Sequence, residues 1–246
     1  LNRVSFKDGR FERDPLILPG FIESLWEDAT GRMWIGIAGG LRRYENGKMH
    51  DLSLNAKVYG VSADREGNYW VATNQGLFKL DDDKIVAHYT TKDGLPNDDV
   101  KTLHQDRRGT LWFGTYGGLA QLKDGKFISY TAADGLAGNR VRSIYEDSDG
   151  TLWIGTYDDG LSRLRDGKFF NYRTEHGLHN NGVFQILEDR RGYFWIGCNK
   201  GIYRVSRHEL NDLAESRRTR VSSVAFGKQG VDENLAVGHR RLRSQL

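Results

Sequence analysis

The stretch Glu146-Asp147-Ser148-Asp149-Gly150-Thr151-Leu152-Trp153-Ile154-Gly155-Thr156 contains the motif Asp-x-x-Gly-x-x-Trp, which occurs five times in the 246 residues. The five copies are Asp28-Gly31-Trp34, Asp64-Gly67-Trp70, Asp106-Gly109-Trp112, Asp147-Gly150-Trp153 and Asp189-Gly192-Trp195. Their tryptophans are 36, 42, 41 and 42 residues apart. The chain is therefore a tandem repeat with a period of about 42 residues.

One copy of the repeat is typical of four short strands joined by turns. In the third copy we expect strands at 100–105, 111–115, 119–122 and 126–130. The turn after the first strand begins at Asp106, whose carboxylate can accept backbone hydrogen bonds, and contains Gly109, which tolerates positive φ. Asp124-Gly125 is a strong signal for a two-residue hairpin of type I′, because both central residues of that turn need positive φ.

Four antiparallel strands in about 42 residues are the blade of a β-propeller, so the sequence predicts an all-β fold with five complete blades and partial blades at both ends. The tryptophan of each second strand is expected to pack between neighbouring blades. One short helix is predicted over 207–216, because Ser206-x-x-Glu209 is a capping box and apolar residues follow at helical spacing. A delayed fourth strand is expected at 221–226.

The predicted blades follow one another along a single propeller domain. The boundaries are 1–14 for the outer half of a truncated blade, 15–52, 53–89, 90–130 and 131–172 for four blades, 173–226 for a blade with a helical insertion, and 227–246 for an unassigned basic tail. The resulting count, just under six blades, favours a fragment of a larger protein.

Composition excludes several classes of protein. The chain has 30 glycines and only 3 prolines, and no Gly-X-Y period, so it is not collagen-like. Its net charge of +3 is close to balance and argues against nucleic-acid binding. A single cysteine, Cys198, excludes an internal disulfide. The chain begins at Leu1 and shows no leader, which favours a fragment or a processed chain.

The repeat resembles a known family. Residues 106–115 and 146–156 are similar to the two-component regulator propeller repeat, and Asp93-Gly94-Leu95, Asp134-Gly135-Leu136 and His176-Gly177-Leu178 match its interblade loop. The resemblance covers about residues 3–205. The second copy departs from it, being shorter and without the Asp-Gly-Leu loop.

This resemblance implies the extracytoplasmic sensor region of a bacterial histidine kinase, hybrid kinase or related receptor. It implies a periplasmic location, a non-catalytic segment and no cofactor. It further implies a small polar ligand, of which an oligosaccharide is one example, no nucleic acid, and contact with adjoining blades or an immunoglobulin-like module. A homodimer formed through the parent protein is also implied.

The ligand is expected on the face that carries the interblade loops and the loops between second and third strands. Those loops vary from copy to copy and are rich in tyrosine and amide or carboxylate side chains, which suit a sugar or a polar peptide. The candidate residues are Asn97, Tyr116, Asn139, Tyr157, Asp158, Asp159, His179, Asn180, Asn181 and Asn199. The alternative role of these asparagines is to satisfy backbone groups of their own loops.

Metal binding is not expected. Asp147-x-Asp149-Gly150 superficially resembles part of a calcium loop but lacks the later ligands, so turn capping is the better interpretation. His176, His179 and Cys198 lack the spacing of a zinc site.

Two other functions stay open. The first is a propeller enzyme, a polysaccharide lyase or a glycoside hydrolase, with inner-strand residues such as His104, Tyr145 and Gln185 near the axis. The second is an intracellular interaction scaffold of the WD-repeat kind. The arginines of 217–243 could contact phosphate, but Phe226 is the only aromatic residue among them. A solvated chain end is therefore the better interpretation.

Overall fold

A computed structural model describes residues 2–7, 10–15 and 22–226, and their contacts group them into two compact units. Unit 1 contains the described residues up to Thr90 together with Asp98–Val100, and unit 2 contains Thr91–Asn97 and the described residues from Lys101 onward. Each unit is described by itself below.

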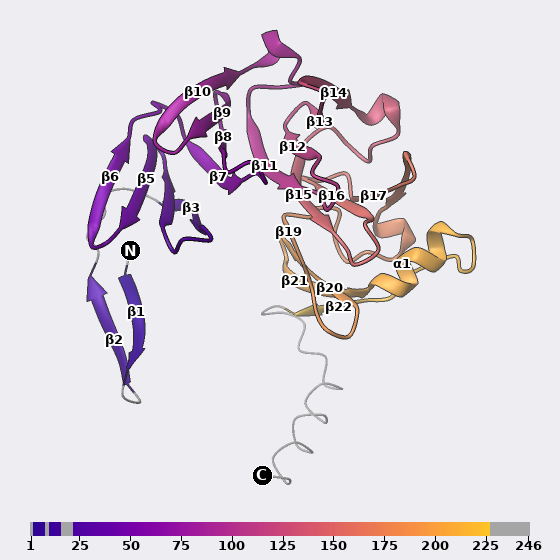
Figure 1. Cartoon of the computed structure of the whole chain (residues 1–246). Coiled ribbons are helices and arrows are strands. Elements are labelled where there is room, and N and C mark those ends of the chain that lie inside the picture. Colours follow the sequence, from indigo (N-terminus) through magenta and orange to yellow (C-terminus); the bar gives the residue numbers. More distant parts are fainter. Residues whose placement is uncertain (1, 8–9, 16–21, 227–246) are drawn as a thin grey trace. The chain divides into compact units, whose positions relative to one another are not determined.

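Unit 1 consists of a two-stranded hairpin and two four-stranded sheets (Figure 1). The hairpin is β1 (Asn2–Lys7) and β2 (Arg10–Pro15). The first sheet is β3 (Ile22–Glu27), β4 (Met33–Ile37), β5 (Gly40–Glu45) and β6 (Lys48–Leu52). The second is β7 (Val58–Ala63), β8 (Tyr69–Thr73), β9 (Gly76–Asp81) and β10 (Lys84–Tyr89).

Unit 2 consists of three four-stranded sheets. The first is β11 (Val100–Gln105, its first residue assigned to unit 1), β12 (Leu111–Thr115), β13 (Gly118–Lys123) and β14 (Lys126–Tyr130). The second is β15 (Val141–Glu146), β16 (Leu152–Thr156), β17 (Leu161–Arg165) and β18 (Lys168–Tyr172). The third is β19 (Gln185–Glu188), β20 (Tyr193–Cys198), β21 (Gly201–Ser206) and β22 (Ser223–Phe226), with helix α1 (Arg207–Ala214) between its last two strands.

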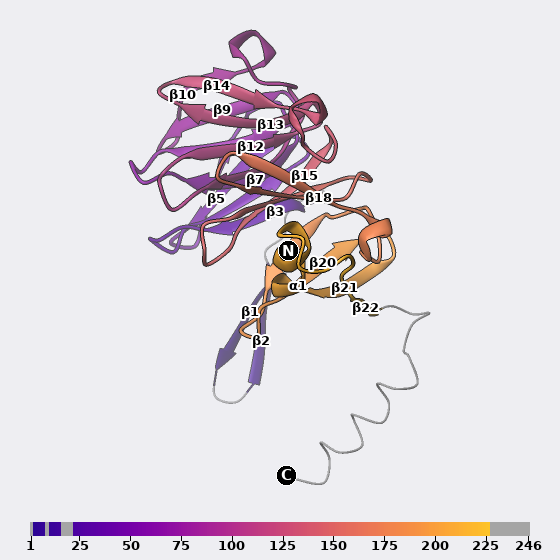
Figure 2. The same ribbon diagram turned by 90° about the vertical axis from the view of Figure 1, so that its right-hand side faces the viewer.

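Each sheet is an antiparallel meander in which sequential strands are neighbours, and this is the predicted blade. In unit 2 the blades follow one another in the order of the chain (Figure 2), and β12 lies against β15 and β15 against β19. The all-β fold, the five four-stranded blades and the short helix are therefore confirmed.

Local predictions agree closely with the observed elements. Three of the four strands expected in the third copy have the predicted bounds, and β13 is one residue longer at each end. Asp124 and Gly125 both have positive φ, 50° and 73°, as the type I′ turn requires. Helix α1 starts as predicted, with the Ser206 hydroxyl accepting from the backbone N–H of Glu209, but it ends two residues earlier.

Short 3₁₀ turns in the interblade loops were not expected. They are η1 (Thr91–Asp93), η2 (Ala132–Asp134) and η3 (Thr174–His176). The second and third each end at the glycine of the Gly-Leu pair, Gly135 or Gly177, in the left-handed region. The late fourth strand of the last blade begins at Ser223, two residues after the expected start.

The Asp-x-x-Gly-x-x-Trp motif forms one hydrogen-bonded turn in every blade. In the fourth copy the Asp147 carboxylate accepts from the backbone N–H groups of Asp149 and Thr151 at 2.9 and 3.0 Å, and from the indole N–H of Trp153 at 2.9 Å. The aspartates 28, 64, 106 and 189 make the same three bonds to the second, fourth and sixth residues after them. The carboxylate thus ties the turn to the strand that follows it.

The apolar core lies between neighbouring blades, as predicted for the tryptophans. In unit 2, Trp153 is fully buried and packs against the β19–β22 blade, where its ring lies 4.9 Å from that of Phe194. Trp112 packs in the same way against Leu152 and Leu164 of the β15–β18 blade. In unit 1, Trp34 packs against Tyr69 of the next blade.

Some predicted boundaries stay predictions. The hairpin β1–β2 ends at Pro15, one residue beyond the segment 1–14 expected to be the outer half of a truncated blade, and the basic tail 227–246 lies outside the described residues. Among the described residues, no helix has both the length and the apolar character needed to cross a membrane.

Candidate ligand-binding site

The loops expected to carry a ligand site lie together in unit 2. The backbone N–H of Tyr157, in the β16–β17 loop, donates to the carbonyl of Arg140 in an interblade loop at 2.8 Å. The N–H of Gly160 donates to Asn181 at 2.9 Å, and that of Val183 donates to Thr156 at 2.9 Å. These bonds confirm, within unit 2, that the two kinds of loop share one face.

Three residues at the start of an inner strand, or just before it, occupy equivalent places beside this face. Lys101, Arg142 and Phe184 each follow the valine that leads into the first strand of a blade in unit 2. Arg142 stands at an irregularity in the pairing of β15 with β16, between Val141 and Ser143. Such a bulge turns a side chain away from the regular alternation of the strand and is common beside functional sites.

These residues interleave with two tyrosines of the adjacent loops. The ammonium of Lys101 lies 4.5 Å from the centre of the Tyr116 ring. A guanidinium N–H of Arg142 donates to the Tyr116 hydroxyl at 3.2 Å, and the guanidinium lies 5.4 Å from the centre of the Phe184 ring. The Tyr157 ring is 6.3 Å from Tyr116 and 5.5 Å from Phe184. We call Lys101, Tyr116, Arg142, Tyr157 and Phe184 the cation–aromatic row.

The charges beside the row are unequal. Arg140 lies over the Tyr157 ring at 4.7 Å and forms a close ion pair with Asp158, so these two charges offset each other. The Tyr116 hydroxyl is the one hydrogen-bond acceptor that Arg142 has among the described residues, and none of its partners there is a carboxylate. Arg142 therefore adds to the row a half-buried positive charge that no carboxylate of the described residues pairs with.

Charged side chains near the corresponding positions of unit 1 neutralise each other. Glu23 and Tyr59 stand at the same kind of irregularity in β3 and β7. Lys57 forms a 2.6 Å ion pair with Glu23 and lies 5.5 Å from the centre of the Tyr59 ring. Because lysine and glutamate compensate each other, this part of unit 1 offers a weaker electrostatic site than the row does.

Asp159 is a half-buried carboxylate next to the row. Burial raises its pKa, and the neighbouring charge of Asp158 raises it further. Gly138 packs directly against the carboxyl group, and a Cβ at that position would clash with it. The backbone N–H of Asp159 donates to the Thr156 hydroxyl at 3.0 Å, so the residue is held by its own loop.

Most of the candidate asparagines have a role inside their loops. Asn139 and Asn181, which are 42 residues apart, accept from the first N–H of η2 and of η3, those of Ala132 and Thr174, both at 2.8 Å. Asn97 holds the same place one repeat earlier and lies against Gly117. The Asn180 side chain accepts from the Gly182 N–H at 2.7 Å. These amides support the loops, and their direct contact with a ligand stays a prediction.

The remaining candidates belong to the last blade. The His179 ring lies 5.7 Å from the Tyr203 ring, and the Tyr203 hydroxyl donates to the Asn180 carbonyl at 3.3 Å. Asn199 is exposed in the β20–β21 turn. The structure thus brings Tyr116, Tyr157 and Asp158 to the row and gives the other candidates, apart from the exposed Asn199, local contacts.

Sequence reasoning missed Lys101, Arg140, Arg142 and Phe184. A signal for three of them was present, since the residue after the first valine of each inner strand changes from lysine to arginine to phenylalanine at a fixed place in the repeat. Variation at one position of an otherwise regular repeat is typical of a surface that recognises a partner.

The residues considered for an enzyme lie further along the inner strands and have separate partners. His104 lies 3.5 Å from Glu146, while the Tyr145 hydroxyl donates to Glu188 at 2.9 Å. Burial and the bond to Glu188 raise the pKa of Tyr145 to about 12. Gln185 is exposed at the start of β19.

Metal coordination finds no support in the part of the chain that the structure describes. The five motif aspartates are occupied by their own turns and tryptophans, and no group of three or more histidine, cysteine or acidic side chains is arranged there to hold a metal ion. Cys198 is a free, half-buried thiol in β20.

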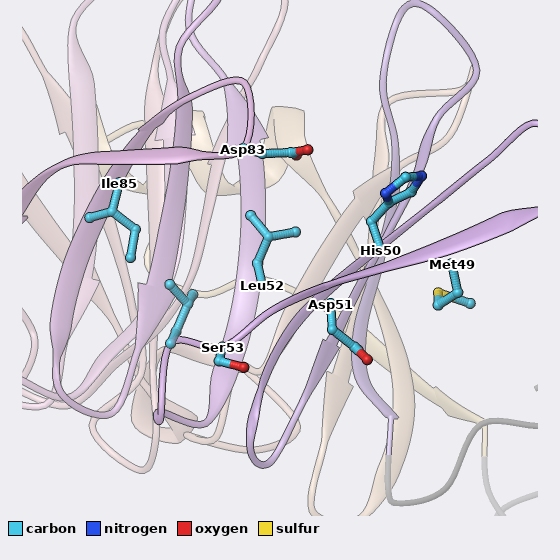
Figure 3. A pocket seen from close by; sticks show the side chains of 8 residues that line it. Met49, His50, Asp51, Leu52, Ser53, Asp83 and Ile85 are labelled. Atoms are coloured by element: carbon cyan, nitrogen blue, oxygen red, sulfur yellow. The ribbon is translucent and has the colours of Figure 1, made fainter.

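Two hollows have linings that share no residue with the row. One, of about 480 Å³ in unit 1, is lined by residues 49–54 at the end of β6 and by Asp83 and Ile85 of the second blade (Figure 3). Its carboxylates are neutralised, since Asp51 pairs with Arg42 and Asp83 with Arg43. The other, of about 350 Å³ in unit 2, lies between the β11–β14 and β15–β18 blades beside their Asp-x-x-Gly turns.

Comparison with protein families identifies the repeat. The model of the two component regulator propeller matches residues 94–117, 135–158 and 177–200. The chain contains two component regulator propeller repeats. Each matched segment runs from an interblade Gly-Leu pair through the Asp turn and the tryptophan into the next loop. The two component regulator propeller repeats of unit 2 thus contain most of the candidate site.

Solved structures share the fold. The chain is 23% identical to the extracellular domain of a protein described as the hybrid two component system BT3049 from B. thetaiotaomicron, with a TM-score of 0.73 over 90% of this chain and 31% of that one. The chain is 21% identical to the extracellular domain of BT4673, described as a one component system of the same organism. The TM-score is 0.67 over 84% of this chain and 31% of that one. The chain therefore spans about a third of the length of these two proteins.

The same fold occurs in an enzyme. Virginiamycin B lyase from Staphylococcus aureus is 16% identical, with a TM-score of 0.65 over 86% of this chain and 71% of that one. At such identities the likeness shows the propeller fold and no activity. The comparison with curated proteins found no match.

Proposed function

We propose that the two component regulator propeller repeats of this chain form the ligand-binding, non-catalytic region of a bacterial two-component receptor, on the extracytoplasmic side of the membrane. The observation that carries the proposal is the cation–aromatic row, in which Arg142 is held between Tyr116 and Phe184 without a carboxylate partner in the described residues. The likeness to the extracellular domains of a hybrid two component system and of a one component system supports the cellular setting.

The chemistry of the row favours a polar ligand that carries a carboxylate or sulfate group. A guanidinium can offer paired N–H donors to such a group, and its stacking on aromatic rings leaves the edge donors available. The rings of Tyr116, Tyr157 and Phe184 supply flat apolar surface beside those donors. Rings and cations side by side suit an acidic oligosaccharide, whose sugar faces are apolar and whose acid groups are charged.

Ligand binding would be transmitted by shifting the packing of the propeller against the rest of its receptor. The β16–β17 loop at the row is tied to the segments that lead into β15 and β19, the inner strands of two successive blades, so a ligand across them favours one relative arrangement of those blades. The receptor need not contain a catalytic group in this segment for that purpose.

Calorimetric titration of the 246-residue chain with uronic-acid disaccharides and with neutral disaccharides of the same linkage tests the proposal. We expect binding of the acidic series only, and a loss of about tenfold or more in affinity for Arg142→Gln, equivalent to one charge-assisted hydrogen bond. Lys126→Gln, an exposed change on β14, is the matched control and should bind normally.

Two outcomes would contradict the proposal. One is equal binding of the acidic and neutral disaccharides by the natural chain. The other is unchanged affinity in Arg142→Gln. Chromatography of the titrated sugars provides a further check, because cleavage or elimination products would indicate an enzyme and not a sensor.

A further inference from the structure

The β19–β22 blade has one face on which large apolar side chains stand exposed. Leu187, Ile202 and Val224 are 60, 50 and 38% exposed. The strand register places Leu187 beside Trp195, Trp195 beside Arg204 and Arg204 beside Val224, so these four form one line across the four strands. Exposed apolar surface of this kind marks an interaction site.

Earlier blades of unit 2 show what covers the equivalent line. Trp153 is fully buried because the β19–β22 blade packs on it through Phe194. Trp112, one repeat earlier, is buried by Leu152 and Leu164 of the β15–β18 blade. Trp195 is the third member of this series and is half-buried, with Phe226 of its own blade 5.0 Å away.

An arginine beside the tryptophan is a second feature of this line. Arg43, Arg163 and Arg204 pair in register with Trp34, Trp153 and Trp195. Arg43 forms ion pairs with Asp82 and Asp83, in the β9–β10 turn of the next blade of unit 1.

Arg163 repeats this pairing in unit 2. It forms an ion pair with Glu215 at 3.4 Å, and Glu215 lies in the connection between the third and fourth strands of the next blade. In both units, the arginine of one blade therefore pairs with an acid from the third connection of the blade that covers it.

Arg204 occupies the equivalent position in the β19–β22 blade, but it lacks the acidic partner that Arg43 and Arg163 have. Its guanidinium lies 4.4 Å from the centre of the Tyr193 ring, 5.7 Å from Trp195 and 6.0 Å from Phe226. Within residues 22–226, Arg204 forms no ion pair, in contrast to Arg43 and Arg163. The line therefore combines an uncovered apolar strip with a positive charge at the place where the blades of Trp34 and Trp153 each use a salt bridge to the next blade.

We propose that this face of the β19–β22 blade binds one further four-stranded blade of the same repeat, whose connection between third and fourth strands carries an aspartate or glutamate that pairs with Arg204. A second copy of this chain fits less well. The turn of its first blade that corresponds to Asp82-Asp83 is Asn46-Gly47, and the nearby Glu45 already lies 3.6 Å from Arg43.

Insertion of a blade with the required turn tests the proposal. A second copy of residues 53–90 placed after Phe226 supplies Asp82 and Asp83 in the spacing found after β6. The matched control carries the same insertion with Asp82→Asn and Asp83→Asn in the inserted copy. A second insertion, of residues 173–226 with Glu215, serves if the first does not fold.

Hydrogen exchange followed by mass spectrometry is the measurement. We expect at least one insertion to slow amide exchange of β20–β22 about tenfold or more. The asparagine control should slow this exchange less. Leu187→Asp should restore the exchange rate of the natural chain. Failure of both insertions to slow exchange would overturn the proposal. So would a dimer of the natural chain that Leu187→Asp dissociates, because a second copy would then be the occupant.

Discussion

The indole N–H of Trp153 donates a hydrogen bond to the carboxylate of Asp147, 2.9 Å away, and both side chains are fully buried. The aspartate also accepts two backbone hydrogen bonds from its own turn. One carboxylate therefore fixes the turn between two strands and orients the ring that fills the space between two blades. This explains why the motif joins residues six positions apart.

Replacement of Asp147 by alanine should strongly destabilise the chain. The change leaves the Trp153 indole N–H and two backbone N–H groups without their acceptor, and we expect a loss of about 3 kcal/mol in the free energy of unfolding. Urea denaturation followed by tryptophan fluorescence measures it. Ser148→Ala, in the same turn but exposed, is the control and should lie within about 0.5 kcal/mol of the natural chain. Equal effects of the two changes would contradict this role for Asp147.

Acid should destabilise unit 1 through Asp28. Burial alone would raise the pKa of this carboxyl, but hydrogen bonds from Thr30, Trp34 and Arg32 outweigh burial and hold the pKa well below its ordinary value of 3.8. Because the folded-state pKa is depressed, the stabilisation is present above about pH 4 and is lost as the pH falls toward the folded pKa.

The measurement is the urea midpoint between about pH 5 and pH 2. The urea midpoint of the natural chain should decrease as the pH is lowered. Asp28→Asn should be less stable at pH 7, and its midpoint should decrease less as the pH is lowered. An unchanged slope in Asp28→Asn would show that other groups, such as Asp64 and Asp189 with their lowered pKa values, account for the acid sensitivity.

Asp159 should affect the pH dependence of stability in the direction opposite to Asp28. Burial and the charge of Asp158 raise its pKa, so the ionised form costs stability at neutral pH, and this cost disappears once the group is protonated in both folded and unfolded states. We therefore expect Asp159→Asn to raise the urea midpoint at pH 7 and to have little effect below about pH 4. Asp158→Asn relieves part of the same repulsion but also removes the ion pair with Arg140, so its gain should be smaller. A lower midpoint for Asp159→Asn at pH 7 would count against the raised pKa.

Much of the blade could be predicted from neighbours in the sequence. Asp124-Gly125 specifies its hairpin because both residues take positive φ, and Ser206 with Glu209 specifies the start of α1. The end of α1 and the 3₁₀ turns of the interblade loops were less predictable. Gly135 and Gly177 close η2 and η3 in the left-handed region, whereas the Gly-Leu pairs in the sequence indicate only a loop.

The candidate site could be predicted only in part. The tyrosines 116 and 157 stand out as aromatic residues in variable loops, and the structure places both in the cation–aromatic row. Arg142 did not stand out, because its distinction comes from the irregular pairing of β15 with β16 and from the rings on either side. Both roles considered for Asn139 and Asn181 are consistent with the sequence: their amide oxygens accept backbone N–H groups of their own loops, and direct contact with a ligand stays a prediction.

The sequence by itself determined the repeat, the four-stranded blade and the turn chemistry, since these depend on hydrogen bonds between residues a few positions apart. Only the tertiary structure decided which side chains of different repeats meet. Lys101, Arg142 and Phe184 are about 42 residues apart and come together because successive blades stack with their inner strands adjacent. Arg163 meets Glu215 for the same reason, 52 residues along the chain. Spacing in a repeat predicts equivalence, but contact between repeats depends on how their faces pack.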